Sequence, residues 1–364
     1  MKNTFGSSIT VTLFGESHGE YIGAVLDGIS PGIKIDYDAI SGALAQRRPS
    51  GKISTARVEA DEYILASGVH NGITTGTPLC LLIPNTNKSS KDYAALADTP
   101  RPSHADYAAG CKYHGFEDKR GGGHFSGRIT AALVAVGAIL RSALLSKGIK
   151  IGTHISRIGD VYDRGFACLD KDIDSLNAAL FPTLSASAEA LMKKKIEAAA
   201  SEGDSVGGVL ECAVVGMPAG VGEPWFDSME SVLSHALFSI PGIKGVEFGL
   251  GFGFANSTGS GANDPFAMEG DKVVTLSNNN GGINGGITNG MPLIFRCAVK
   301  PTPSIFKEQK TVSLSEKKDT TLKIEGRHDP AIIHRARAVV DAVCAIALAD
   351  MLTARFGTDY LKNC

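Results

Sequence analysis

The chain has 364 residues, of which 43% are hydrophobic and 20% are charged, and its formal net charge is −2. This composition supports a sizeable apolar core, and the nearly balanced charge excludes bulk attraction of a polyanion such as nucleic acid, so any anion site must be local. Seven cysteines without a CxxC pair favour free thiols in a reducing compartment over a disulfide framework.

The N-terminal segment, residues 1–19, lacks the features of a secretory signal, because its apolar residues alternate with Ser and Thr and are interrupted by Gly. The most apolar stretch, residues 131–140, is too short to span a bilayer. We therefore expect a cytoplasmic protein with no membrane partner and no nucleic-acid partner.

Hydrophobic patterning and turn residues predict alternating strands and helices along the chain. In chain order, the expected elements are a strand at 21–29, a helix at 36–48 with an aspartate cap, a strand at 78–84, a helix at 129–147 closed by Gly148, a strand at 150–161, an amphipathic helix at 186–202, a strand and turn at 207–220, a capped helix at 226–239, a strand at 292–300 and a C-terminal helix at 331–354.

Three features of the N-terminal half recur in the same order in the C-terminal half. A strand of similar sequence precedes a helix in both halves, GITTGTPL at 72–79 matches GITNGMPL at 286–293, and a long apolar helix follows each time. We predict a single domain built by internal duplication, with halves at about 1–160 and 205–364 and a site between them. Chance similarity of glycine-rich turns is the alternative.

Four polar loops between the apolar elements each contain a histidine. They are GESHG at 15–19, RPSHADY at 101–107, KRGGGHFSGR at 119–128 and EGRHDP at 325–330. A single histidine is more often a turn or cap residue than a catalyst. Four such loops, each with Ser, Asp or Arg beside the histidine, indicate a shared site.

The spacing of these residues argues against three common kinds of site. Neither HxxxH nor CxxC is present, so we expect no metal site. The GxSxG elbow of Ser–His–Asp hydrolases is absent, and in GESHG the histidine directly follows the serine, where neighbouring side chains of an extended chain point apart. GGGHFSGR contains neither a Walker A motif nor GxGxxG, which argues against a nucleoside triphosphate or Rossmann dinucleotide site.

Basic residues lie in or beside the same loops: Arg47, Arg48, Lys52, Arg101, Lys119, Arg120, Arg128, Arg327, Arg335 and Arg337. Arginine binds phosphate and carboxylate groups with paired hydrogen bonds, and glycine-rich loops offer backbone N–H groups to phosphate. A solvated basic helix end is the alternative for any one of them. Taken together, they indicate an enzyme that handles a small phosphorylated and carboxylated anion by histidine proton transfer, and they leave open a phosphate-bearing cofactor.

A series of longer motifs runs along nearly the whole chain. In order, they are GSSITVTLFGESHG, RRPSGK, GVHNGITTGTPL, RPSHADY, RGGGHFSGR, EGDSVGG, GEPWFDSM, GIKGVEFGLGF, GGINGGITNG, KPTPSI and GRHDPAIIHRA. With these motifs the sequence resembles the chorismate synthase family. The resemblance implies an α+β fold, a layered β-α-β sandwich with a central helical layer and pseudo-twofold halves.

The resemblance also implies a reaction. The family converts 5-enolpyruvylshikimate 3-phosphate to chorismate, the last step of the shikimate pathway, by a trans-1,4-elimination of phosphate and a ring proton. It needs reduced FMN (FMNH2) although there is no net redox change. Family members are usually homotetramers. This chain has no long insertion of the kind associated with built-in flavin reductase activity, so we expect an external flavin reductase to supply FMNH2.

Roles for individual residues follow from the matched motifs. The resemblance implies that His18 protonates the departing phosphate and that His104 protonates or hydrogen-bonds the reduced flavin. Asp329, with Ser17 as a relay, would help the flavin collect the ring proton. The residues that match flavin-contacting motifs are His124, Phe125, Ser126, Pro241, Gly242, Gly285, Lys300, Pro301, Thr302, Pro303, Ser304 and Arg327. Those expected to bind the anionic substrate are Arg47, Arg48, Lys52, Arg101 and Arg128.

Two motifs depart from the common family pattern. Where many members have GGGRSSAR, this chain has GGGHFSGR, so that His124 replaces an arginine and Phe125 a serine. The segment RRPSGK also differs from the common RRPG. Two rival functions remain: a flavoprotein oxidoreductase that consumes NAD(P)H, and an anion-binding module without catalysis.

Overall fold

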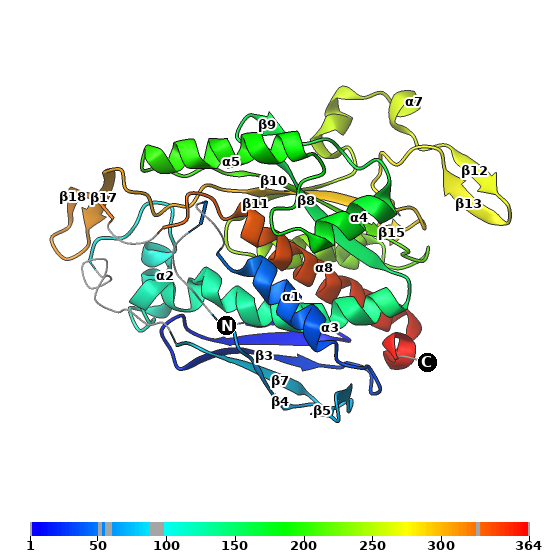
Figure 1. Cartoon of the computed structure of the whole chain (residues 1–364), viewed down its shortest axis with the longest axis horizontal. Helices are drawn as coiled ribbons and strands as arrows, with labels where there is room; N and C mark the ends of the chain where they lie inside the picture. Colours follow the sequence, from blue (N-terminus) through cyan, green and yellow to red (C-terminus); the bar gives the residue numbers. More distant parts are fainter. Residues whose placement is uncertain (1, 50–52, 55–59, 87–97, 325–327, 363–364) are drawn as a thin grey trace.

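The computed structural model describes residues 2–49, 53–54, 60–86, 98–324 and 328–362. Two five-stranded sheets enclose a layer of helices, so that the body of the molecule has three layers (Figure 1). The predicted α+β fold, a β-α-β sandwich with a central helical layer, is therefore confirmed.

Both sheets are antiparallel throughout. The first sheet has the order β1 (Thr4–Phe5), β2 (Thr10–Gly15), β3 (Tyr21–Asp27), β7 (Leu79–Pro84) and β4 (Ile64–Ser67). The second has the order β11 (Ile243–Phe248), β16 (Leu293–Val299), β10 (Gly208–Val215), β8 (Lys150–Ile158) and β9 (Val161–Tyr162). Buried and half-buried residues alternate along β7 and β16, as expected for strands with one face on the core.

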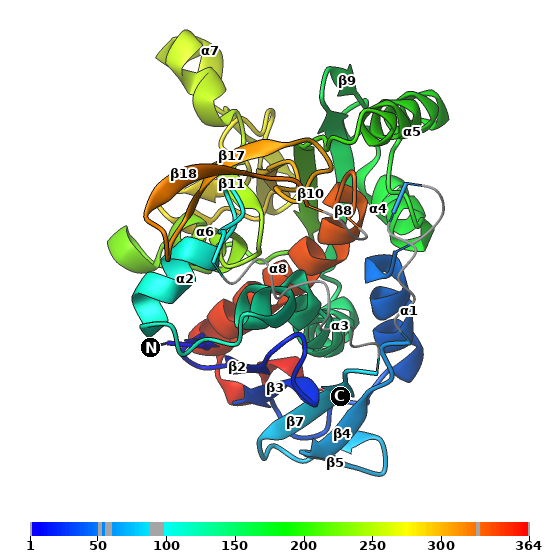
Figure 2. The same ribbon diagram turned by 90° about the vertical axis from the view of Figure 1, so that its left-hand side faces the viewer.

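The helices α1 (Tyr37–Arg47), α3 (Thr130–Ser146) and α8 (Ile333–Phe356) lie between the sheets (Figure 2). α3 and most of α8 are buried on all sides, which is why their sequences lack a polar face. At Gly137 in α3, a Cβ would lie only 2.4 Å from the Cβ of Ala342 in α8, so glycine permits the close helix crossing. The predicted helices at 129–147 and 331–354 are confirmed.

One helical stretch, Gly127–Ser146, is long and apolar enough to cross a membrane by length and composition, with a mean hydropathy of 1.9. It is longer than the apolar segment 131–140 considered from the sequence. In the structure, 72% of its most apolar window is buried inside the protein. Packing between the two sheets therefore accounts for its apolar composition.

A buried polar network joins the central helices. The Arg337 guanidinium in α8 donates to Gln46 Oε1 of α1 over 2.9 Å and to the Ala179 carbonyl over 2.6 Å. Its ion-pair partner Asp341, 3.3 Å away, accepts from the Thr153 hydroxyl of β8 over 2.6 Å. Burial lowers the pKa of Arg337 from its ordinary value. The network ties α8 to α1 and to the second sheet.

Arg337→Leu is expected to lower the free energy of unfolding by about 3–5 kcal/mol, because the buried Asp341 charge then keeps only the more distant Arg141 guanidinium, 3.7 Å away. Urea unfolding followed by circular dichroism measures this change. Arg355→Leu, at the exposed end of α8, is the control and is expected to change stability by less than about 1 kcal/mol. Equal losses in both variants would show that the network adds nothing.

The remaining elements lie around this body. The helices are α2 (Asp106–Tyr113), α4 (Leu169–Ala178), α5 (Ala186–Ser201), α6 (Met229–Phe238) and α7 (Gly259–Ala262). The hairpins are β5 (Val69–His70) with β6 (Ile73–Thr74), β12 (Phe266–Glu269) with β13 (Lys272–Thr275), β14 (Ile283–Asn284) with β15 (Ile287–Thr288), and β17 (Gln309–Ser313) with β18 (Lys318–Leu322).

The strand predicted at 150–161 is divided in the structure. β8 ends at Ile158, and the chain turns back at Gly159 (φ +56°) so that β9 pairs with the end of β8. The sequence prediction ran through this turn because apolar residues continue on both sides of it. Patterning also failed to predict β2, β4, β11, α2 and α4, which are short or bordered by polar residues.

Candidate active site

The connection between β2 and β3 carries Ser17 and His18, and both side chains are buried. It is a tight turn in which the Gly19 N–H donates to the Glu16 carbonyl over 3.0 Å. Gly15 ends β2 with φ +94°, and a Cβ at that position would lie 2.4 Å from a backbone oxygen of β3. The close approach of the two strands therefore requires glycine here.

The side chains of Ser17 and His18 contact each other, contrary to the expectation that they point apart. Ser17 Oγ lies 3.1 Å from His18 Nδ1, and the same hydroxyl donates to the Arg120 carbonyl over 3.2 Å. The expectation that adjacent side chains point apart applies to an extended chain, whereas residues 16–19 form a turn. Ser17 therefore orients the His18 ring.

The glycine loop of the third predicted cluster lies against His18. Gly121, Gly122 and Gly123 all have positive φ, and the Gly123 carbonyl accepts from the Ser17 N–H over 3.1 Å. A Cβ on Gly121 would lie 2.2 Å from His18 Cε1, and a Cβ on Gly122 would lie 3.4 Å from His104 Cε1. Consecutive glycines thus contact the two histidines, and the backbone between these contacts carries no side chain.

His104 belongs to a second polar network. Its Nδ1 lies 2.6 Å from Asp106 Oδ1, and Arg101 donates to both oxygens of the same carboxylate over 2.7 and 2.8 Å. Burial would raise the pKa of Asp106, but the hydrogen bonds from Arg101 and His104 outweigh it and hold this pKa far below its ordinary value. Asp106 is therefore ionised at neutral pH and fixes His104 through Nδ1.

A cavity of about 190 Å³ adjoins this network. Its lining comes from the RPSHADY loop, α2, the glycine loop and the turn after β17, and includes His104, Arg101, Gly122, Phe125 and Leu314. The cavity gives the His104 side of the glycine loop a space for a small ligand.

A loop from the second half of the chain reaches the same place. Lys300 Nζ donates to the Ser103 carbonyl over 2.6 Å, and its backbone N–H donates to the Gly242 carbonyl over 2.9 Å. Burial, followed by the nearby charge of Lys244, lowers the pKa of Lys300. The Pro241–Gly242 turn, Lys300 and the His104 loop are therefore neighbours, although they are far apart in the sequence.

The residues after the glycine loop have structural contacts of their own. His124 Nδ1 donates to the Gly15 carbonyl over 2.8 Å, so the ring fastens the glycine loop to the end of β2. Phe125 packs edge-to-face on Tyr113 with ring centres 5.9 Å apart. Ser126 Oγ accepts from the Arg128 N–H over 3.2 Å at the start of the helical stretch that leads into α3.

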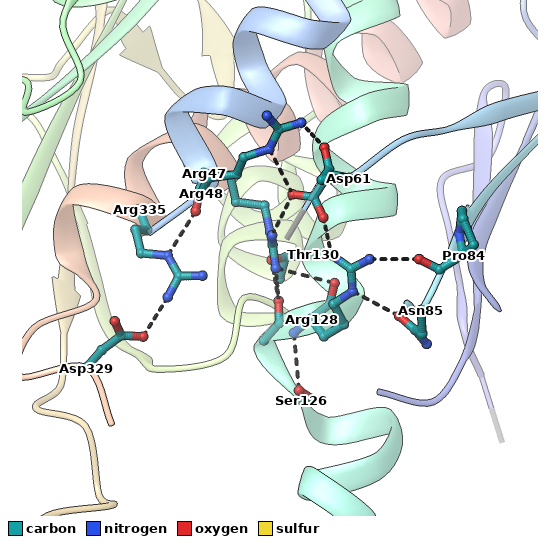
Figure 3. A network of polar contacts seen from close by, with 12 residues as sticks. Arg47, Arg48, Asp61, Pro84, Asn85, Ser126, Arg128, Thr130, Asp329 and Arg335 are labelled. Carbon is teal, nitrogen blue, oxygen red and sulfur yellow. Dashed lines mark hydrogen bonds and ion pairs between the residues drawn. The ribbon is translucent and has the colours of Figure 1, made fainter. Parts of the chain in front are cut away.

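Three of the predicted anion-binding arginines surround one carboxylate, Asp61, that the sequence analysis did not identify (Figure 3). Arg47 Nη1 and Arg48 Nε lie 3.4 and 3.6 Å from Asp61 Oδ2, and Arg128 Nη1 contacts Asp61 Oδ1. The Asp61 side chain is fully buried. The cluster of Arg47, Arg48, Arg128 and Asp61, called here the arginine cluster, has two more positive charges than negative charges.

Asp329 lies beside this cluster. Its carboxylate accepts from Arg335 Nη1 over 2.5 Å, and Arg335 Nε donates to the Arg47 carbonyl over 2.9 Å (Figure 3). The predicted residues Lys52 and Arg327 lie outside the described part of the chain. The structure therefore places Asp329 close to the arginines predicted to bind the substrate anion.

Asp61→Asn is expected to lower the free energy of unfolding by about 3–5 kcal/mol, because the buried Arg47 and Arg128 and the half-buried Arg48 lose their shared counter-ion. Inorganic phosphate at millimolar concentration should raise the melting temperature of the variant more than that of the unchanged protein. Thermal unfolding with and without phosphate measures both effects, with the exposed Asp319→Asn as control. Equal phosphate effects in all three proteins would contradict an anion-binding cluster.

Three residues of the site were missed or left unassigned. Asp61 lies in VEADEYILAS, and Asn85, which contacts Arg128, follows β7 in IPNTN; neither stretch carries a recognisable motif. Asp106 belongs to the RPSHADY motif but was given no role there. Its position two residues after His104 is the sequence feature that could have indicated their contact. Only the folded chain brings Asp61 and Asn85 to Arg128.

Gly285 is placed elsewhere. It lies at the turn between β14 and β15, and the next residue, Gly286, accepts from the Met229 N–H at the start of α6 over 2.8 Å. Figure 1 shows β15 far from α2 along the long axis of the molecule. Within one chain, the structure gives Gly285 a different neighbourhood from the other predicted flavin-contacting residues.

The part of the chain that the structure describes contains no group of three or more His, Cys, Asp or Glu side chains suited to hold a metal ion. The site instead combines two histidines, a glycine loop and clustered cations. This arrangement suits proton transfer to or from a small anion.

Comparisons with known proteins agree with this chemistry. The family model described as chorismate synthase matches residues 9–353. The chain is 46% identical over 350 residues to a chorismate synthase of Pyrococcus abyssi (strain GE5 / Orsay), covering 96% of this chain and 97% of that relative. It is 45% identical over 357 residues to one from Dehalococcoides mccartyi (strain ATCC BAA-2100 / JCM 16839 / KCTC 5957 / BAV1), covering 96% of each chain.

A solved structure also matches. A protein described as "Crystal Structure of Chorismate Synthase" superimposes with a TM-score of 0.75 at 30% sequence identity, covering 97% of this chain and 93% of the other. The chain therefore belongs to the chorismate synthase family, and its activity is that of a lyase that eliminates phosphate from 5-enolpyruvylshikimate 3-phosphate to give chorismate.

Proposed function

We propose that this lyase reaction depends on reduced FMN. We also propose that His18 and His104, which lie beside the glycine loop, carry out different proton transfers. The observation that carries the proposal is the contact of Gly121 with His18 and of Gly122 with His104. A loop without side chains between two histidines lets flat ligands approach both rings. Reduced FMN, when bound, would supply transient electron transfer to and from the substrate, with no net redox change.

His18 protonates the phosphate as it leaves. Its ring is 4% exposed, so the transfer is shielded from bulk water, and Ser17 holds Nδ1. Histidine suits this role because its ordinary pKa lies near neutral pH, and the leaving dianion needs a proton donor in that range.

His104 acts on the flavin side of the glycine loop. Asp106 holds Nδ1, and the Cε1–Nε2 edge of the ring faces Gly122, because a Cβ on that glycine would lie 3.4 and 3.7 Å from these two atoms. The Nε2 atom is thus directed toward the loop, where it donates to or exchanges a proton with the cofactor.

Asp329 provides an oxygen base for the ring proton, with Ser17 as the relay. Its neighbour Arg335 donates to one carboxylate oxygen over 2.5 Å and so fixes the position of the carboxylate. The arginine cluster and Arg101 bind the phosphate and the two carboxylates of the substrate. The convergence of three arginines on one place supports this assignment.

The residues present fit a phosphate-bearing flavin. Thr302 Oγ1 is buried and has no hydrogen-bond partner among the described residues, so it is available to a ligand. The Ser205 hydroxyl donates to the Thr302 carbonyl over 2.7 Å. Ser304, two residues further along the chain, is also buried. We assign the loop from Lys300 to Ser304, the Pro241–Gly242 turn and residues 124–126 to the flavin. Arg327 and Gly285 are added from the motif match alone, and within one chain Gly285 lies apart from the other assigned residues.

The oligomeric state is proposed to be a homotetramer. Several large apolar side chains near the β12–β13 hairpin and α6 are 70% or more exposed: Trp225, Phe226, Phe252, Phe266 and Leu276. The hairpin projects from the body at the upper right of Figure 1. Exposed apolar groups of this kind support contacts between copies of the chain. Sedimentation of the protein as a monomer at micromolar concentration would contradict the assignment.

The single domain is proposed to be an internal duplication with a revised boundary. β2, β3, α1, β4, the β5–β6 hairpin, β7 and α3 follow one another in the same order as β8, β10, α6, β11, the β14–β15 hairpin, β16 and α8. In the first sheet β3 lies between β2 and β7, and in the second sheet β10 lies between β8 and β16, at the corresponding position. Because β8 pairs in the second sheet, we place the start of the second half near Lys150 rather than at 205.

We also propose a cytoplasmic enzyme that relies on a separate flavin reductase. The relatives match 96% of the 364 residues, so within these residues there is no long unmatched insertion. Oxidised FMN with NADPH and no added reductase should therefore give no turnover. Turnover under these conditions would assign reductase activity to this protein.

The anaerobic reaction with dithionite-reduced FMN tests the proposed function. Phosphate and chorismate should appear in equal amounts while the flavin spectrum stays reduced. A flavoprotein oxidoreductase would instead oxidise reduced cofactor in step with product, and a binding module would release no phosphate. Either result would overturn the proposal.

A further inference from the structure

Asn85 makes hydrogen bonds to two parts of the candidate site, the turn that carries His18 and the arginine cluster. It follows β7 and is 8% exposed, and both ends of its carboxamide are occupied. Nδ2 donates to the Glu16 carbonyl over 3.0 Å and to the Gly19 carbonyl over 3.1 Å. Oδ1 accepts from Arg128 Nε over 2.9 Å.

The partners fix which way the amide points. Two backbone carbonyls on one side require a donor, and a guanidinium N–H on the other side requires an acceptor. Only an uncharged amide provides both in a side chain of this length. The Asn85 backbone N–H adds a further bond to the Glu20 carbonyl over 3.0 Å.

The two carbonyls belong to the first and last residues of the turn that presents His18. Glu16 and Gly19 are already joined by the hydrogen bond that closes this turn, so Asn85 clamps both of its ends. On the other side, Arg128 is held by Asp61 and by the Pro84 carbonyl, 3.3 Å from Nη2 (Figure 3). The arginine cluster and the His18 turn are therefore linked through one side chain.

We propose that Asn85 is a positioning residue, which holds the Ser17–His18 turn at a fixed place relative to the anion-binding Arg128. The inference rests on the proposed role of His18 as proton donor. In the proposed reaction Arg128 helps to hold the substrate anion and His18 supplies the proton. The rate therefore depends on the distance between Arg128 and the His18 turn. Misplacement of a catalytic group by about 1 Å can reduce a rate about 100-fold.

Asn85→Asp is the most informative variant. It keeps the shape of the side chain and an acceptor for Arg128, but it turns a carboxylate oxygen toward the carbonyls of Glu16 and Gly19. We expect kcat to fall by about 10- to 100-fold, whereas KM for 5-enolpyruvylshikimate 3-phosphate changes by less than about threefold. Asn85→Ala should show a similar loss in kcat. It should also show a higher KM, because Arg128 loses its acceptor and is less well placed to bind the substrate. The exposed Asn284→Asp is the matched control and should leave both constants unchanged.

A double-variant comparison separates this inference from the role of His18. In the His18→Ala background, Asn85→Asp should have little further effect, since the group that it positions is gone. An equal fold-loss in both backgrounds would show that Asn85 does not act through His18. Near-normal turnover of His18→Ala alone would instead remove the proposed role of His18.

A measurement without turnover covers the case in which His18→Ala is too slow to assay. The NMR resonance of the His18 Cε1–H should shift in Asn85→Asp and stay in place in Asn284→Asp. If Asn85→Asp does not fold, the same resonance is read in Asn85→Gln, which keeps both kinds of bonding group on a longer side chain. An unchanged His18 resonance in a folded Asn85 variant would overturn the inference.

Discussion

His18→Ala should lower kcat by about 10²- to 10⁴-fold, the range expected when a general acid is removed. The ring is buried, held by Ser17 and in contact with Gly121, so solvent cannot readily take over the role that we propose for it, as proton donor to the leaving phosphate. Anaerobic assay of phosphate release with reduced FMN measures the change. Circular dichroism should show an intact fold.

His70→Ala is the matched control for this prediction. His70 lies in the exposed β5–β6 hairpin, and its loss should leave kcat unchanged. His104→Ala should slow turnover as well, through the cofactor side of the glycine loop. A His18→Ala protein with near-normal kcat would remove this histidine from the reaction, whatever the effect of His104→Ala.

Gly121→Ala should lower kcat about as strongly as loss of His18 itself, by about 100-fold or more. The added Cβ would lie 2.2 Å from His18 Cε1, 2.6 Å from Nδ1 and 2.9 Å from Ser17 Oγ, so the ring and its partner must move. The positive φ of +62° adds backbone strain for alanine. The same anaerobic assay measures the loss.

Gly42→Ala controls for the substitution. Gly42 lies in α1, and an added Cβ would meet nothing within 4 Å, so activity should be unchanged and stability should rise by about 0.5–1 kcal/mol. Full activity in Gly121→Ala would mean that the glycine loop can move away from His18. The arrangement of the two histidines around this loop would then not govern the reaction.

Much of the fold follows from local sequence. The long helices α3 and α8 are recognisable from their long apolar sequences. Strands β10 and β16 are predominantly apolar, with one charged residue in each. Similar motifs occur in the same order in the N-terminal and C-terminal parts of the chain, and this repetition indicates two similar sheets. The boundary that we propose between the two halves does not follow from sequence, because the pairing of β8 with β10 is a long-range contact.

The site was predicted to the extent that its residues stand in motifs. His18, His104 and the glycines between them are local features, and the structure brings them together. Asp61 and Asn85 could not be found in this way, since each acquires its role only by contact with arginines distant in the chain. The Ser17–His18 contact was missed because it depends on a turn rather than on an extended strand.

The departure at His124 has a physical explanation in the structure. The ring donates to the Gly15 carbonyl and so connects the glycine loop to the strand that leads into the His18 turn. At this position the chain thus has a structural hydrogen bond. We expect the cation for the flavin phosphate to come from the second half of the chain, where Lys300 lies beside Ser103.

A crystal structure of the ternary complex with FMN and 5-enolpyruvylshikimate 3-phosphate tests the central claim most directly. The account predicts that both ligands lie over Gly121–Gly123, with a His18 nitrogen within hydrogen-bond distance of the substrate phosphate and His104 Nε2 within hydrogen-bond distance of the flavin. A substrate phosphate or a flavin ring bound away from this glycine loop would contradict it.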